Sequence, residues 1–217
     1  MTEARYRDGA RRIAPIALAA LAFSISFGVL ARASGIGSVE AIVMSATVFA
    51  GSAQFAIASI LGVGGAVASA ILAAVLLNAR YAPISVSLAP VFVGGRLRRL
   101  LESQLIVDES WALAGRSGRF EWGVLAGAGM LLYTLWVAST ALGTVVGGVL
   151  EDPNDLGLDA AFPALFLALL VPQVRSRRAL AAAVLGGTIA LALIPIAPAG
   201  VPIVAAASAC LIGWRRP

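Results

Sequence analysis

The stretch of residues 41–93 has the hydrophobicity of a membrane segment, yet polar residues and prolines interrupt it. In hydrocarbon, a polar group without a hydrogen-bond partner or a break in the backbone costs several kcal/mol. Both persist in a membrane only where they face protein or line a cavity. The stretch therefore predicts a membrane fold with protein-lined interruptions at Gly51-Ser52, Gln54, Asn78-Ala79-Arg80, Pro83 and Pro90.

The rest of the chain shares this hydrophobic character. Of its 217 residues, 60% are hydrophobic and 12% are charged, whereas about 25% of the residues in a soluble domain are charged. The composition predicts an all-α polytopic membrane protein, with residues 1–217 in a single membrane domain.

Several residue types needed for catalysis are missing. The chain has no histidine, its sixteen basic residues are all arginine, and Cys210 is its single cysteine. Histidine triads, histidine metal ligands, lysine Schiff bases and cysteine metal clusters are therefore excluded. An aspartyl-type intramembrane enzyme needs two carboxylates that meet within the membrane, and no apolar span holds two. We expect no enzyme, no catalytic residue, no metal and no cofactor.

The arginines predict how the chain crosses the membrane, because cytoplasmic loops are enriched in arginine and lysine. Since they lie in loops between apolar spans, the net charge of +5 does not indicate a nucleic-acid partner. The expected cytoplasmic segments are the N-terminus 1–13, the loop 94–120 and the C-terminus 214–217. Single crossings are expected at about 14–31, 121–149, 158–174, 179–195 and 201–214, within a total of about six to eight transmembrane segments.

The number of crossings within residues 41–93 follows from this topology. The segment begins outside and ends inside, so it crosses the membrane an odd number of times. It is far too long for one helix of roughly 20 residues and slightly short for three with turns. One span plus a re-entrant or broken hairpin fits, and so do three short spans, with the turn at Gly62-Val63-Gly64-Gly65.

Polar residues around Gly51-Ser52 leave two interpretations open. Ser45, Ser52 and Ser59 recur every seven residues and would share one face of a continuous helix, with Gln54 on roughly the opposite side. Polar groups on two faces indicate a fully buried helix or an interrupted one. An interruption would free backbone groups to bind an amino or carboxylate group, whereas the alternative is ordinary hydrogen bonding between helices.

Asn78 and Arg80 follow a run of mostly apolar residues. An arginine at the centre of a membrane helix costs about 2.5–3.5 kcal/mol, so Arg80 should face a cavity, pair with a carboxylate or extend to the membrane interface beside Tyr81. Its functional interpretation is a bidentate partner for a carboxylate, with Asn78 as a neutral donor and acceptor.

Three carboxylates are candidates for coupling or gating. Asp159 begins a predicted span, so it is either a helix N-cap or a carboxylate that couples to protons or pairs with Arg80. Asp108 and Glu109 lie among the arginines of the loop 94–120, so they belong either to a salt-bridged cytoplasmic helix or to a gate.

Two recurring patterns concern helix packing. The pairs Gly123/Gly127 and Gly143/Gly147 predict close packing within the chain or against a partner. Short apolar segments bracketed by Pro83 and Pro90, and by Pro163 and Pro172, occur in the two halves of the chain. Such a pair is typical of inverted repeats, and chance recurrence is the alternative.

Five motifs, in the same order along the chain, resemble the AzlC family of branched-chain amino acid exporters. The resemblance covers roughly residues 14–175, and its first and last motifs are the most distinctive. These motifs are Phe49–Phe55, Leu77–Tyr81, Ser87–Pro90, Asp108–Ser110 and Gly157–Phe166.

The resemblance implies export of amino acids such as valine, leucine or isoleucine across a bacterial inner membrane, together with a small AzlD-type membrane subunit. We therefore expect a multi-pass secondary transporter with cytoplasmic termini, and protons are a candidate coupling ion. The alternative is a scaffold or regulatory subunit that does not transport. The expected substrate-binding residues are Gly51, Ser52, Gln54, Phe55, Asn78, Arg80 and Phe162, and the expected coupling or gating residues are Asp108, Glu109 and Asp159.

Overall fold

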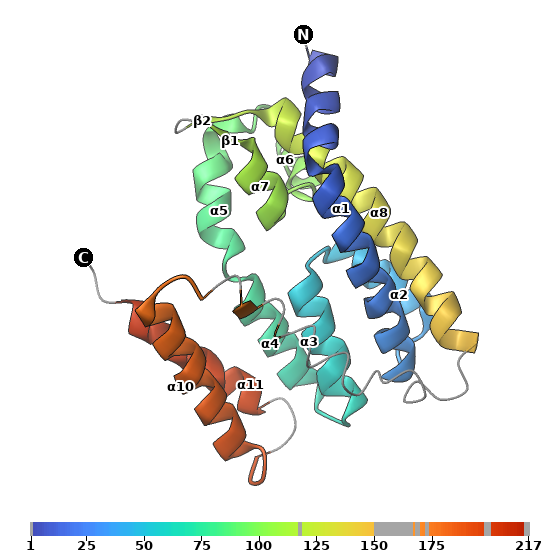
Figure 1. Cartoon of the computed structure of the whole chain (residues 1–217). Helices are drawn as coiled ribbons and strands as arrows, with labels where there is room; N and C mark the ends of the chain where they lie inside the picture. Colours follow the sequence, from blue (N-terminus) through green and yellow to red (C-terminus); the bar gives the residue numbers. More distant parts are fainter. Residues whose placement is uncertain are drawn as a thin grey trace.

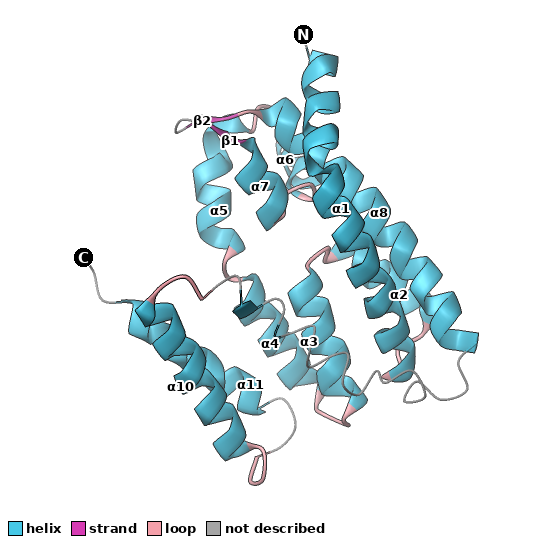
Figure 2. Ribbon diagram, viewed as in Figure 1, coloured by secondary structure: helices cyan, strands magenta, loops and turns pink. Residues whose placement is uncertain are grey.

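The computed structural model of the chain describes residues 2–116, 119–149, 167, 170, 171, 174–197 and 201–214. Within these residues, helices predominate and one short antiparallel hairpin is present (Figure 2). The elements are α1 (Thr2–Ala33), α2 (Ser38–Thr47), α3 (Gly51–Gly62), α4 (Val67–Asn78), α5 (Tyr81–Leu88), η1 (Ala89–Val91), α6 (Arg96–Ser103), α7 (Asp108–Ala114), β1 (Gly115–Arg116), β2 (Arg119–Phe120), α8 (Trp122–Val149), α10 (Arg177–Leu193), α11 (Val201–Ala206) and η4 (Ala207–Trp214).

Two of the described helices are long and apolar enough to cross a membrane alone, over Ala4–Ala33 in α1 and Trp122–Val149 in α8. A third crossing is formed if α4 and the segment Tyr81–Val91 count as one span with a 40° bend. The predicted helical membrane fold and its broken helix are therefore confirmed. The total of six to eight segments stays a prediction.

Helices α1 and α8 pack side by side and run in the same direction (Figure 1). A Cβ added at Gly127 would overlap the carbonyl oxygen of Tyr6, and one added at Gly143 would overlap that of Ile25. Glycine therefore allows the two backbones to approach closely. The glycine pairs of α8 serve packing within the chain, which is one of the two predicted alternatives.

Helices α2 and α3 form a hairpin that begins and ends near the C-terminal end of α1 (Figure 1). A Cβ added at Gly62, the last residue of α3, would lie 2.7 Å from the Oγ of Ser34, just after α1. The hairpin therefore returns to the level at which α1 ends, and only α4 and α5 continue to the other end. Residues 41–93 thus contain one broken span and one re-entrant hairpin, rather than three short spans.

The break between α2 and α3 also changes the predicted pattern of polar faces. The expectation that Ser45, Ser52 and Ser59 share one helix face does not hold, because residues 48–50 interrupt the helix between Ser45 and the other two. An interrupted helix was one of the two predicted alternatives, and α3 begins at Gly51.

The segment 94–120 contains a second hairpin, formed by α6 and α7, at the end of the molecule where α1 and α8 begin (Figure 1). The carbonyl oxygen of Leu105, in the turn of this hairpin, packs against Gly129. Because Gly129 lies about two turns into α8, the turn reaches well below the end of the helix bundle. The two hairpins therefore approach each other from opposite ends of the molecule.

The N-terminal end of α1 and the segment 94–120 lie at the same end of the molecule. The Nη1 of Arg5 is 3.8 Å from the Oε2 of Glu121. This placement agrees with an odd number of crossings between the end of α1 and the start of α8. That this end faces the cytoplasm stays a prediction from the arginines.

The C-terminal part contains α10, α11 and η4, which pack against one another, and α11 also contacts α4. α10 lies close to the predicted span 179–195, and α11 with η4 covers the predicted span 201–214. Asp159, Phe162 and most of the predicted span 158–174 lie outside the described residues. The proline-bracketed segment 163–172 falls largely there too, so inverted repeats stay a prediction.

Candidate functional site

The two breaks in the helices meet in the middle of the molecule. One break, at residues 48–50, separates α2 from α3, and the other, at Ala79-Arg80, separates α4 from α5. Phe49 lies in the first break with φ at 43°, a left-handed conformation that non-glycine residues rarely adopt. No side chain caps the N-terminus of either α3 or α5. Two uncapped helix N-termini therefore lie at the two breaks.

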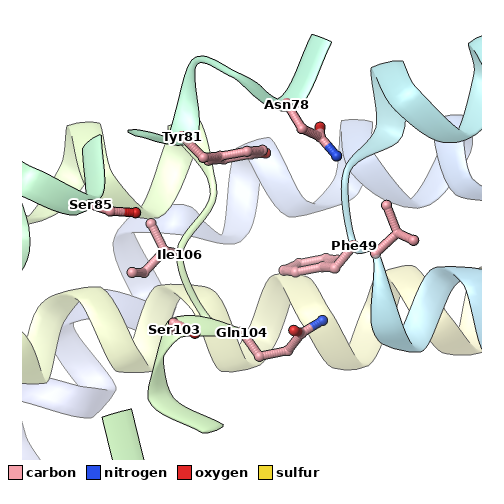
Figure 3. Close-up of a pocket in the computed structure, with 8 residues that line it drawn as sticks. Phe49, Asn78, Tyr81, Ser85, Ser103, Gln104 and Ile106 are labelled. Carbon is pink, nitrogen blue, oxygen red and sulfur yellow. The ribbon is translucent and has the colours of Figure 1, made fainter. Parts of the chain in front are cut away.

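A cavity of about 200 Å³ occupies this region. It is smaller than the roughly 300–1,000 Å³ typical of pockets for drug-sized ligands, so its scale is that of a small metabolite. Figure 3 shows Asn78 and Tyr81 facing Phe49 and Gln104 across it. Both breaks, the N-terminal half of α5 and the turn between α6 and α7 supply its lining: Val48, Phe49, Asn78, Tyr81, Ser85, Ser103, Gln104 and Ile106.

Asn78 brings an unsatisfied polar group to the cavity wall. Its Oδ1 is buried and has no hydrogen-bond partner among the described residues. A buried polar atom left unpaired costs about 1–3 kcal/mol. The amide nitrogen of Asn78 points toward the cavity in Figure 3, and a flip of the amide would present the oxygen instead. The side chain is therefore suited to bind a polar group in the cavity.

Arg80 connects three elements beside the cavity. Its Nη2 donates to the Oγ of Ser52, at 3.1 Å, and lies 3.1 Å from the Oδ2 of Asp108. Its guanidinium carbon lies 5.3 Å from the centre of the Tyr81 ring. Arg80 thus joins the start of α3, the break after α4 and the start of α7. Of the predicted alternatives for Arg80, the structure shows pairing with a carboxylate.

Gln104 and Tyr133 donate hydrogen bonds to the carbonyl groups at the C-terminal end of α2. The Nε2 of Gln104 donates to the carbonyl oxygens of Ala46 and Thr47, at 3.0 and 3.1 Å. The hydroxyl of Tyr133 donates to the Ala46 oxygen, at 3.0 Å. The last carbonyl groups of a helix have no partner within it, so these side chains stabilise a helix end placed inside the molecule.

Gln54 lies in a separate buried network. Its Nε2 donates to the Oγ of Ser45, at 2.8 Å, and its Oε1 accepts from the Nε1 of Trp136, at 3.0 Å. The Oγ of Ser45 is also 2.8 Å from the Oγ1 of Thr140. The network ties both arms of the α2–α3 hairpin to α8. Both polar atoms of Gln54 therefore have protein partners away from the cavity lining.

Gly51 and Phe55 have packing contacts outside the cavity lining. A Cβ added at Gly51 would lie 2.8 Å from the Cη2 of Trp136. Phe55 is 1% exposed and packs edge-on against Phe27, with ring centres 5.8 Å apart. Of the expected binding residues, Asn78 lines the cavity, and Ser52 and Arg80 contact each other outside its lining. Gln54 and Phe55 lie in the core.

The network around Gln54 leads to a stability prediction. Replacing Gln54 with leucine would leave the Trp136 indole N–H and the Ser45 hydroxyl with fewer partners, at a cost of about 1–3 kcal/mol. We expect a lower unfolding temperature for the detergent-purified protein, measured by intrinsic fluorescence. Thr188→Val is the control, since the Thr188 hydroxyl donates to Val184 O of its own helix, at 2.8 Å, and has no other partner in the described part of the chain. An unchanged unfolding temperature together with weaker substrate binding would instead place Gln54 in the binding site.

The two acids at the start of α7 differ in their surroundings. Asp108 pairs with Arg80, and acidic groups in a first helical turn interact favourably with the helix dipole. Glu109 is exposed in the isolated chain, yet desolvation by the protein around its carboxyl raises its pKa. The charge of Asp108 raises that pKa further, while a backbone hydrogen bond and Arg80 lower it. Glu109 therefore keeps its proton to a higher pH than an ordinary glutamate.

The turn before α7 is rigidly held. The Oγ of Ser110 accepts from the Val107 N–H, at 3.0 Å, and donates to the Leu105 carbonyl, at 2.9 Å. The indole N–H of Trp111 donates to the Oγ of Ser87 on α5, at 2.9 Å.

Within the described residues, no cluster of three acidic or cysteine side chains could hold a metal ion. The site therefore offers hydrogen bonds and one ion pair as its chemistry.

Sequence reasoning missed part of the cavity wall. Ser85, Ser103, Gln104 and Ile106 were not among the expected site residues, and Tyr81 was expected only as an interfacial aromatic. A signal for Gln104 exists in principle, because a broken helix needs donors for its last carbonyl groups. Nothing in the linear sequence indicates which donor reaches them.

Comparison with known proteins identifies the family. The family model described as AzlC protein matches residues 15–150. An uncharacterized membrane protein of Archaeoglobus fulgidus is 35% identical over 97% of this chain and 95% of its own length. The branched-chain amino acid transport protein AzlC of Bacillus subtilis is 27% identical over 78% of this chain and 68% of its own.

A further relative, the inner membrane protein YgaZ of Escherichia coli, is 24% identical over 89% of this chain and 85% of its own. No solved structure matches the chain. The family match covers more than half of the chain and confirms the resemblance drawn from the five motifs. The protein belongs to the AzlC family of membrane proteins.

Proposed function

We propose that this protein is a secondary transporter that exports branched-chain or similar amino acids across the inner membrane. The observation that carries the proposal is the cavity where the two helix breaks meet, with Asn78 in its wall and the Arg80–Asp108 ion pair two residues further along the chain. Broken helices at mid-membrane are a recurring way to build substrate sites in secondary transporters. The Bacillus subtilis relative, described as a branched-chain amino acid transport protein, supports the same substrate class.

The polar side of the cavity suits the carboxylate of an amino acid. Arg80 supplies a guanidinium, which binds carboxylates through charge-assisted hydrogen bonds. The amide of Asn78 points into the cavity from the next turn, and the Ser52 hydroxyl already contacts Arg80. In this proposal these three side chains hold the carboxylate, with Gly51 and Gln54 supporting the start of α3.

The apolar side of the cavity suits a branched aliphatic side chain. Val48, Phe49 and Ile106 line it with hydrocarbon, and burial of an aliphatic side chain contributes about 1.5–3 kcal/mol. Phe55 and Phe162 are also proposed to contact the substrate side chain. Phe55 lies in the core. A cavity of about 200 Å³ favours one small amino acid over a peptide.

Further features of the proposal concern coupling, partner and orientation. Proton coupling would need a carboxylate, and Asp108, Glu109 and Asp159 are the candidates. The raised pKa of Glu109 favours it among these for proton binding. A small AzlD-type membrane subunit is the proposed partner. Cytoplasmic termini, as the arginines predict, would place the α6–α7 hairpin on the cytoplasmic side.

Transport is tested by counterflow in liposomes. The purified chain, a small AzlD-type subunit and the two together are reconstituted separately, and the liposomes are preloaded with unlabelled leucine. We expect transient accumulation of labelled leucine, inhibited by external valine and isoleucine but not by glutamate. Counterflow by the small subunit alone would support the scaffold alternative, and no counterflow in any combination would overturn the proposal. Faster efflux of labelled leucine from preloaded cells that express the protein tests the direction.

A further inference from the structure

We propose that Asp108 is an internal carboxylate that holds Arg80 when the site is empty and gives way to the carboxylate of the substrate. This inference rests on the proposed function and adds a step to it. Arg80 would exchange one carboxylate for another, so it would stay paired with an anion both before and after substrate binds.

The geometry of Arg80 supports an exchange at a single atom. The same nitrogen, Nη2, contacts both Ser52 and Asp108, each at 3.1 Å. A substrate carboxylate that approaches this nitrogen from the cavity would therefore compete with Asp108, while Ser52 could remain in place. Asn78, two residues before Arg80, and Tyr81, directly after it, line the cavity from which substrate would arrive.

The ion pair is weak enough to exchange. The side chains of Arg80 and Asp108 are 42% and 43% exposed. Ion pairs with this exposure contribute about 0.2–1 kcal/mol, far less than buried pairs. Substrate can displace Asp108 without a large loss of binding free energy, whereas a fully buried pair would exclude it.

Asp108 has a stabilising environment after it releases Arg80. It is the first residue of α7, where the partial positive charge of the helix N-terminus favours a carboxylate. The hydrogen bond between Trp111 and Ser87 would still hold α7 against α5. Release would therefore loosen only the start of α7, at the turn that approaches the α2–α3 hairpin. Substrate binding would thereby change the contacts between the two hairpins.

A permanent structural ion pair makes the opposite prediction. If Asp108 only positions Arg80 for substrate, removing its charge should weaken binding. If Asp108 competes with substrate, removing its charge should tighten binding. The change in substrate affinity therefore separates the two roles.

The test compares Asp108→Asn with the wild-type protein and with Asp8→Asn. Asp8 is a matched control because it also forms an exposed ion pair, 2.7 Å from Arg12 Nη2, on the distant first turns of α1. Binding of labelled leucine to the detergent-purified protein gives the dissociation constant. We expect Asp108→Asn to lower it about two- to fivefold, from the strength of an exposed ion pair, and Asp8→Asn to leave it unchanged.

Two analogues of leucine sharpen the test. 4-Methylpentanoate keeps the carboxylate and lacks the amino group, whereas 3-methylbutylamine keeps the amino group and lacks the carboxylate. In competition with labelled leucine, Asp108→Asn should tighten binding of 4-methylpentanoate and leave that of 3-methylbutylamine unchanged. Asp108→Glu, which keeps a carboxylate near Arg80, should show a smaller gain. If Asp108→Asn fails to fold, Asp108→Ser provides the same comparison.

The outcomes separate the inference from the proposed function. If the wild-type protein neither binds leucine nor catalyses counterflow, the proposed function fails. If the wild-type protein binds leucine, and Asp108→Asn binds leucine with equal or lower affinity, the proposed function stands and the exchange at Arg80 is overturned. Tighter binding of 3-methylbutylamine would also overturn it, because that ligand cannot replace a carboxylate.

Discussion

Replacing Arg80 with alanine is expected to reduce leucine counterflow to the level of empty liposomes, while the protein still inserts and purifies as a single species. In the proposed site, Arg80 is the cation that binds the substrate carboxylate; it follows the cavity-lining Asn78 by two residues and pairs with Asp108. Hydrogen bonds to charged groups contribute about 1.5–3 kcal/mol, so their loss corresponds to a loss of affinity of roughly tenfold or more.

Arg98→Ala is the matched control for this prediction. Arg98 lies on α6, and its side chain is 62% exposed. Its Nε is 2.7 Å from the Oε1 of Glu102, and neither residue lines the cavity. The Arg98→Ala variant should transport leucine at the wild-type rate. Arg80→Lys should retain part of the activity, because lysine keeps the charge but not the planar donors of a guanidinium. Full counterflow by Arg80→Ala would remove Arg80 from the substrate site.

The location of the two helix breaks could be predicted from the sequence, because polar groups in hydrocarbon need protein partners. Gly51-Ser52 and Asn78-Ala79-Arg80 lie far apart in the chain, but the same physical constraint applies to both. The parity of crossings, counted from the arginines, also limited residues 41–93 to two arrangements. The re-entrant hairpin of α2 and α3 is one of these arrangements.

The partners of the polar residues could not be predicted, because they depend on which segments meet in three dimensions. Arg80 pairs with Asp108, which lies in a segment expected to be a cytoplasmic loop. Gln104 caps α2 from the same segment. Gln54 is a polar residue in an apolar stretch, as expected of a ligand-binding residue, yet its side chain bonds Ser45 and Trp136. A residue type indicates that a hydrogen bond will form, not whether a substrate or the protein supplies the partner.

A large loss of stability is expected for Gly143→Ala, at the contact between α1 and α8. A Cβ at this position overlaps the carbonyl oxygen of Ile25, and one at the facing Gly28 would lie 2.7 Å from backbone atoms of Gly143 and Thr144. Backbone atoms cannot rotate away as side chains do, so the two helices must separate. Overpacking of this kind costs about 1–3 kcal/mol.

Gly187→Ala is the matched control, because Gly187 also lies within a helix but no described atom lies within 4 Å of a Cβ added there. Alanine is favoured over glycine in a helix by about 1 kcal/mol, so this variant should unfold at the same or a slightly higher temperature. Gly143→Ala should unfold at least several degrees lower, measured by size-exclusion chromatography after heating. Equal unfolding temperatures for the two variants would show that the contact between α1 and α8 can widen without cost. The α2–α3 hairpin is anchored to α8 through Thr140 and Trp136, so a separation of α1 from α8 should also disturb the cavity.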